Sequence, residues 1–81
     1  MVLTLGKPSE ETVNLSIECE REHDGRWRAE VPEPPGVLVY ERTAEEALGK
    51  AEVLALRVMA ERIESGESRA VPISIQVPAA V

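Results

Sequence analysis

Residues 43–65 restrict the fold most, because they read as one long helix in a chain of only 81 residues. The segment opens with Thr43-Ala44-Glu45-Glu46, a capping box in which the Thr43 hydroxyl accepts from the backbone N–H of Glu46. Apolar residues then recur at helical spacing up to Ser65, and Gly66 suits a C-terminal cap. We therefore expect a helix about 33 Å long.

Four other segments have strand patterns. Residues 13–20 and 71–77 alternate apolar and polar side chains, residues 26–31 do the same after an Asp24-Gly25 hairpin turn, and residues 37–41 form a less one-sided apolar run. Three prolines between positions 32 and 35 must end strand pairing there, since proline cannot donate a ladder hydrogen bond.

These elements predict one α+β domain over residues 1–81, with a loose arm at 1–12 and a core at 13–77. The expected architecture is two-layered β-β-β-α-β: a mixed four-stranded sheet, strand order 3-2-1-4, with the helix on one face. The last strand follows a helical crossover, so it should lie parallel to the first. Trp27 and Tyr40 are the only aromatic residues, so the core must be aliphatic.

The expected helix is longer than the strands, which at five to seven residues reach only about 17–23 Å. Its C-terminal half should therefore carry apolar surface that the sheet does not cover. Either this half associates with another chain, which we favour, or the helix ends early. The candidate self-association residues are Leu56, Met59, Ala60 and Ile63.

The net charge of −6 disfavours direct binding to nucleic acid and suits a basic protein partner, although an acidic surface also keeps a small domain soluble. The single cysteine, Cys19, excludes an intramolecular disulfide and a structural zinc site. We find neither a signal peptide nor a membrane span, and expect a cytoplasmic protein without a cofactor.

Four acids, Glu18, Glu20, Glu30 and Glu41, are candidates for one sheet face that meets a partner or solvent. Holding Mg²⁺ is the less favoured alternative, because metal sites need convergent ligands that the sequence does not show. Arg26 and Arg28 should share this face and pair with the acids.

No residue pattern predicts catalysis. His23 and Asp24 lie in an expected exposed turn without a third catalytic group, and Cys19 has the parity of a buried strand position. Trp27 shares its parity with Ala29 and Val31, which favours the core over an exposed binding anchor. We therefore predict that the protein is not an enzyme.

The ordered run from Asp24 to Gly36, followed at fixed spacing by Thr43 and Glu45-Glu46-Ala47-Leu48, resembles the HicB family of antitoxins over residues 13–77. The residues that carry the resemblance are Asp24, Gly25, Trp27, Ala29, Pro32, Pro35, Gly36, Thr43, Glu46 and Ala47.

The resemblance implies a partial ribonuclease-H-like fold without catalytic carboxylates, which masks a small basic ribonuclease toxin of the HicA type and self-associates as dimers or tetramers. Complete family members usually add a C-terminal DNA-binding segment, which does not follow here, so we do not expect operator binding. Val37, Glu41 and Arg42 depart from the family pattern. The alternative is therefore an orphan homo-oligomeric structural or regulatory domain without a toxin partner.

Overall fold

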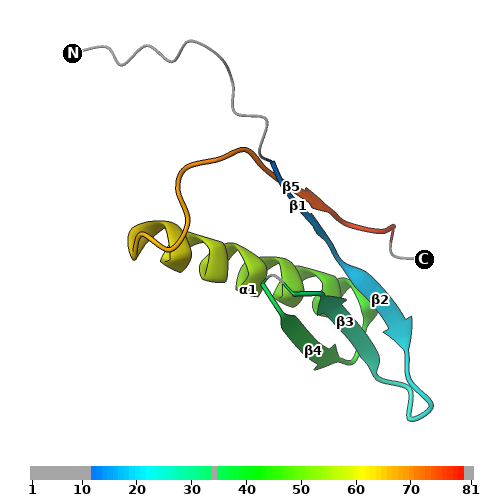
Figure 1. Cartoon of the computed structure of the whole chain (residues 1–81). Coiled ribbons are helices and arrows are strands. Elements are labelled where there is room, and N and C mark those ends of the chain that lie inside the picture. The colour runs from blue at the N-terminus through cyan, green and yellow to red at the C-terminus, as the bar shows by residue number, and fades with distance from the viewer. Residues whose placement is uncertain (1–11, 34, 80–81) are drawn as a thin grey trace.

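The computed structural model describes residues 12–33 and 35–79, which form five short strands and one long helix (Figure 1). In chain order the elements are β1 (Val13–Ser16), β2 (Glu18–Arg21), β3 (Trp27–Val31), β4 (Val37–Glu41), α1 (Ala44–Glu64) and β5 (Ile73–Gln76). The α+β class is confirmed, with the helix packed against short strands. The expected arm at residues 1–12 lies outside the described residues apart from Thr12.

The strands form two small sheets, so the predicted single sheet of order 3-2-1-4 is wrong. One sheet is the parallel pair β1-β5, and the other is the antiparallel sheet β2-β3-β4. The segment predicted as one strand, residues 13–20, divides at Ile17 into β1 and β2. Each half pairs along only one edge, β1 with β5 and β2 with β3. The expected parallel pairing of the last strand with the start of the first is present, in the register Val13↔Ile73.

Proline explains why the two sheets do not merge. The β2–β3 register aligns Glu18 with Glu30, and continuing it would align Ser16 with Pro32. Pro32 has no N–H to donate and ends β3, so β1 extends past the end of its neighbour. In Figure 1 the β1-β5 pair accordingly projects beyond the three-stranded sheet.

The hairpin between β2 and β3 forms as the Asp-Gly pair predicts. The N–H of Gly25 donates to the carbonyl of Glu22 at 3.0 Å, and Gly25 takes a φ of 91°. The Asp24 carboxylate accepts from the backbone N–H of Arg26 at 3.0 Å. A three-residue loop with a left-handed glycine at its end suits the twist of the adjoining strands.

The helix follows its predicted limits closely. The Thr43 hydroxyl oxygen accepts from the N–H of Glu46 at 3.1 Å, which is half of the predicted capping box. At the other end Ser65 is the cap, and Gly66 has a φ of 83° and donates its N–H to the Ile63 carbonyl at 3.2 Å. Within the part of the chain that the structure describes, no helix is long and apolar enough to cross a membrane.

The core lies between α1 and the inner face of the strands, with α1 packed chiefly on β3 and β4, and it extends to Leu15 of β1. Four alanines at the helix–sheet contact have no exposed surface, so the helix approaches the sheet closely. Trp27 is half-buried and packs against this core rather than filling it. The buried apolar residues are Leu15, Ile17, Ala29, Val31, Val37, Val39, Ala47, Leu48, Ala51, Ala55 and Met59.

Candidate protein-binding surfaces

The outer face of the three-stranded sheet, opposite the helix, carries most of the predicted partner-binding residues. Cross-strand neighbours lie on the same face of a sheet, and Glu18 is paired with Glu30, Glu20 with Arg28, and Arg28 with Tyr40. We call this surface the acidic face and define it by Glu18, Glu20, Glu22, Arg28, Glu30, Leu38 and Tyr40. The structure thus brings together three of the four predicted acids.

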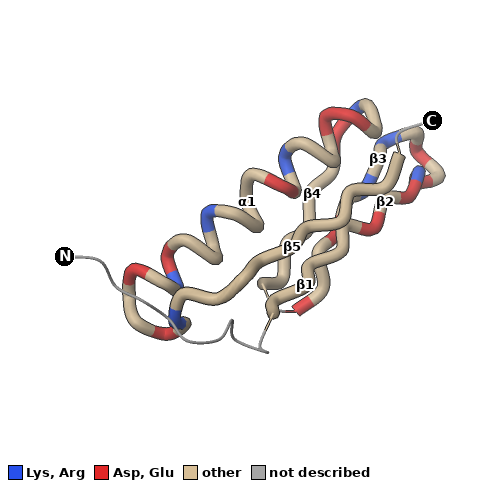
Figure 2. The backbone as a smooth tube through the Cα atoms, turned by 90° about the horizontal axis from the view of Figure 1, so that it is seen from above, with Lys and Arg blue, Asp and Glu red and all other residues tan. Residues whose placement is uncertain are grey.

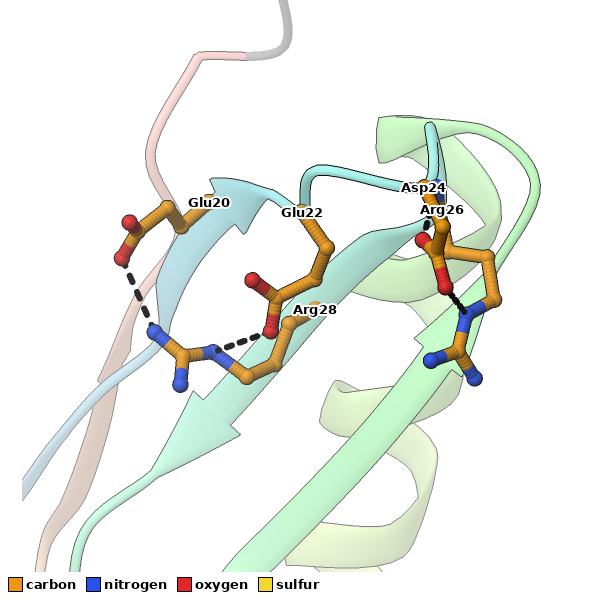
Figure 3. Close-up of polar contacts among 5 residues, drawn as sticks. All are labelled: Glu20, Glu22, Asp24, Arg26 and Arg28. Carbon is orange, nitrogen blue, oxygen red and sulfur yellow. Dashed lines mark hydrogen bonds and ion pairs between the residues drawn. The ribbon is translucent and has the colours of Figure 1, made fainter.

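Arg28 neutralises one end of the acidic face (Figure 3). Its Nη2 lies 2.8 Å from Oε2 of Glu20, and its Nε lies 3.6 Å from Oε1 of Glu22. The charge of Glu22, opposed in part by desolvation and supported by Glu20 and Glu30, raises the pKa of the Arg28 guanidinium. This arginine is therefore engaged within the chain.

The other end of the face holds two carboxylates that make no ion pair of their own in the described chain. Glu18 and Glu30 are directly paired across β2 and β3, and neither takes part in an ion pair among residues 12–33 and 35–79. Like charges opposite each other on a sheet are destabilising. Glu18 and Glu30 therefore repel each other across the two strands.

Glu41 does not belong to the acidic face, contrary to the prediction. It is paired with Trp27, whose side chain packs toward the core, so Glu41 lies on the helix side of the sheet. Strand β4 alternates more regularly than expected: Val37 and Val39 are buried, whereas Leu38 is 54% exposed. The parity of β4, counted from a buried Val37, would have placed Glu41 correctly.

Leu38 and Tyr40 are the apolar members of the acidic face, and the sequence interpretation missed both. Tyr40 is 39% exposed, and the guanidinium carbon of Arg26 lies 4.5 Å from the centre of its ring. The Nε of Arg26 also lies 2.8 Å from a carboxylate oxygen of Asp24. Arg26 therefore forms its ion pair within the hairpin turn and not, as predicted, with the acids of the sheet. Exposed apolar groups among carboxylates are typical of surfaces that bind other proteins.

A second apolar surface runs along the side of α1 that faces away from the sheet. Val53, Leu56, Ala60 and Ile63 follow one another at spacings of three and four residues, and we call them the helix stripe. Val53, Leu56 and Ile63 are 45%, 49% and 38% exposed. The expectation that the sheet leaves part of this helix uncovered is confirmed for these residues.

Met59 is a correction to the predicted self-association set, because it is 4% exposed and belongs to the core. It follows Ala55 by four residues and therefore lies on the sheet-facing side of α1, whereas Leu56 and Ala60 lie on the other side. Val53, which the prediction left out, completes the exposed stripe instead.

The remaining candidates have local roles. Cys19 is half-buried and its pKa is raised, first of all by burial, so the thiol has no feature of an activated nucleophile. His23 is exposed in the hairpin turn. In the described part of the chain, no group of three or more His, Cys, Asp or Glu residues is placed to hold a metal ion.

The residues that carry the HicB resemblance occupy turns, a cap and the core. Gly25 and Gly36 have positive φ angles of 91° and 73°, and Pro32 follows the last residue of β3. Ala29 and Ala47 are fully buried and Pro35 is buried in the loop that leads to β4. Comparison of the chain with protein-family models, with curated proteins and with solved structures finds no match.

Proposed function

We propose that this chain is a non-catalytic protein-binding module of the HicB antitoxin type, which masks a small basic ribonuclease toxin of the HicA type. The observation that carries the proposal is the acidic face, where Glu18 and Glu30 lie opposite each other without an ion pair of their own in the described chain and adjoin the exposed Leu38. A basic partner would relieve the repulsion while it buries Leu38 and Tyr40. We place the module in the cytoplasm, and it needs no cofactor for this role.

The proposal extends to the fold, as a partial ribonuclease-H-like arrangement. Its support is the succession of β2, β3 and β4 as an antiparallel sheet, the crossover through α1, and the return of β5 parallel to β1. A helix that covers one face of the sheet leaves the other face open for binding, as the acidic face requires.

The decisive test compares a double variant of the acidic face with a control variant that replaces two glutamates of α1. Glu18→Gln/Glu30→Gln keeps the shape of the acidic face but removes its repulsion, so we expect a more stable free chain. The same variant should bind a small basic ribonuclease of the HicA type about tenfold more weakly or worse. Glu61→Gln/Glu64→Gln, on exposed positions of α1, should leave binding within about twofold.

Opposite signs for stability and affinity would support the acidic face as a binding site, because a purely structural pair would lose stability. Isothermal titration calorimetry and urea denaturation measure the two quantities. Absence of any complex with a small basic ribonuclease of the HicA type, together with failure to rescue growth from that toxin, would contradict the proposal.

A second candidate function is an orphan homo-oligomeric structural or regulatory domain without a toxin partner. The observation that favours it is the helix stripe, since Val53, Leu56 and Ile63 present apolar surface that nothing in the described chain covers. If it is correct, Leu56→Glu should reduce the mass of the assembly in sedimentation equilibrium. The Glu18→Gln/Glu30→Gln variant should then leave that mass unchanged.

A further inference from the structure

The outer edge of β5 has a complete row of backbone groups with no neighbour among the described strands. The N–H of Val13 donates to the backbone carbonyl of Pro72 at 2.9 Å, and the N–H of Ile17 donates to the backbone carbonyl of Gln76 at 3.0 Å. The even-numbered residues of β5 therefore face β1. In an extended strand the intervening residues, Ile73, Ile75 and Val77, direct their N–H and C=O groups to the opposite side.

The prolines on either side of β5 leave this outer row intact. Pro72 and Pro78 both have even numbers, so the N–H groups that they lack would have faced β1 and not the open edge. Proteins usually protect an open edge with lysine, with proline in the exposed row or with a bulge. Residues 70–79 carry no charged side chain, and Figure 2 shows β1 and β5 free of charge beside the charged helix and hairpin.

The sequence of the edge is complementary to itself. A two-fold axis through Ile75 would place Ile73 opposite Val77 of a second copy, and Ser74 opposite its Gln76. Apolar side chains then meet apolar ones on one face of the sheet, and polar side chains meet polar ones on the other. Ile73 and Val77, which are 37% and 46% exposed, would each gain an apolar cross-strand neighbour.

We propose that β5 is a homodimerisation edge, which pairs antiparallel with β5 of a second copy of this chain about Ile75. The outward-facing residues would exchange about six backbone hydrogen bonds, because each hydrogen-bonded pair in an antiparallel ladder makes two. Two strands alone are marginally stable. Pairing along β5 would join the β1-β5 pairs of two copies into one four-stranded sheet. A second copy is favoured over an unrelated partner because the edge offers no charge that would select one, and its own sequence supplies the match.

The first test asks which amides the dimer protects. Hydrogen exchange of the full chain should slow with rising protein concentration at Ile73, Ile75 and Val77. Ser74 and Gln76 should gain less protection, because their N–H groups already donate to β1 and the dimer only stabilises that pairing. Equal concentration-dependent protection of both sets, or protection of neither, would overturn the proposed pairing.

The second test exchanges charges at the two exposed positions of the edge. Ile73→Lys/Val77→Lys and Ile73→Glu/Val77→Glu each place like charges opposite each other twice, so we expect the dimer Kd of each to rise about tenfold or more. An equimolar mixture of the two should form a heterodimer in native mass spectrometry. Ile73→Lys/Val77→Glu places opposite charges together in the antiparallel register and should retain the dimer.

A control separates this edge from the helix stripe and from the acidic face. Leu56→Glu and Glu18→Gln/Glu30→Gln should leave the Kd of the β5 dimer, measured by sedimentation velocity, within about twofold of the value for the unaltered chain. A monomeric unaltered chain at high micromolar concentration would overturn the proposal. So would a dimer that only Leu56→Glu dissociates, or a β5 edge that pairs with a different protein instead of with itself. None of these outcomes bears on toxin binding, which is measured separately.

Discussion

The three-stranded sheet and the β1-β5 pair differ in how much of their surface the rest of the chain covers. The helix packs over β3, β4 and part of β2, and the core residues of β3 and β4 are at most 8% exposed. In β5, by contrast, Ile73 is 37% exposed and Ile75 only half-buried. The core thus includes Leu15 of β1 but leaves much of β5 exposed, which is why we expect association at β5.

The largest effect should come from truncating one apolar side chain in each region. Met59→Ala removes a buried side chain from the helix–sheet core and should cost about 2–5 kcal/mol of unfolding free energy. Ile75→Ala, in the half-covered sheet, should cost only about 1 kcal/mol when measured on the monomer. Urea denaturation at low protein concentration measures both. Equal costs would mean that the two sheets form one equally packed core.

The loop that ends β3 should be the next most sensitive position. Gly36 has a φ of 73°, so Gly36→Ala should cost about 1–2 kcal/mol from backbone strain. A Cβ there would also meet the Glu33 carboxylate, but that flexible side chain can rotate away. Gly49→Ala is the matched control, since no atom lies within 4 Å of its Cβ position, and it should stabilise α1 by about 0.5–1 kcal/mol.

If Glu33→Ala restored the stability that Gly36→Ala removes, steric contact rather than backbone strain would be the cause. The conformation of the loop between β3 and β4 would then depend on a side chain and not on the backbone. Thermal denaturation of the single and double variants distinguishes the two causes.

The helix cap should contribute less, and only to the packed region. Thr43→Ala removes the acceptor for the N–H of Glu46 and should cost about 1 kcal/mol. Thr43→Ser keeps the hydroxyl and should retain most of the stability. Hydrogen exchange should report the loss at the start of α1, and an equal loss of protection in β5 would contradict the division into two regions.

The smallest effect should be electrostatic and lie at the exposed hairpin. The pKa of Asp24 is lowered, first by the hydrogen bond from the backbone N–H of Arg26 and then by the Arg26 side chain. A lowered carboxyl pKa stabilises the folded chain above the pKa of the unfolded state, and this contribution is lost as the pH falls through the folded value. Asp24→Asn should flatten the dependence of stability on pH in the acidic range. An unchanged slope would show that Asp24 contributes nothing measurable.

Most features that were predicted correctly depend on neighbours in sequence, whereas the parallel pairing of β5 with β1 followed from the crossover rule. Thr43 and Gly66 mark the ends of the helix through hydrogen bonds within one turn, and Asp24-Gly25 forms its hairpin through contacts two or three residues apart. The acidic face was predicted in part, because the alternation of Glu18 and Glu20 is visible in the strand. Glu41 was misplaced because residues 37–40 are all apolar, so the sequence does not show which alternate residues face the core.

Sequence by itself determined the helix, its caps, the turns, the positions where proline ends a strand, and the aliphatic character of the core. Only the tertiary structure decided that residues 13–20 serve two sheets, that Met59 is buried while Leu56 is exposed, and that β5 keeps an open edge. The physical reason is that strand pairing and burial join residues far apart in the chain. Local chemistry can end a strand at Pro32, but it cannot state which partner the neighbouring strand takes next.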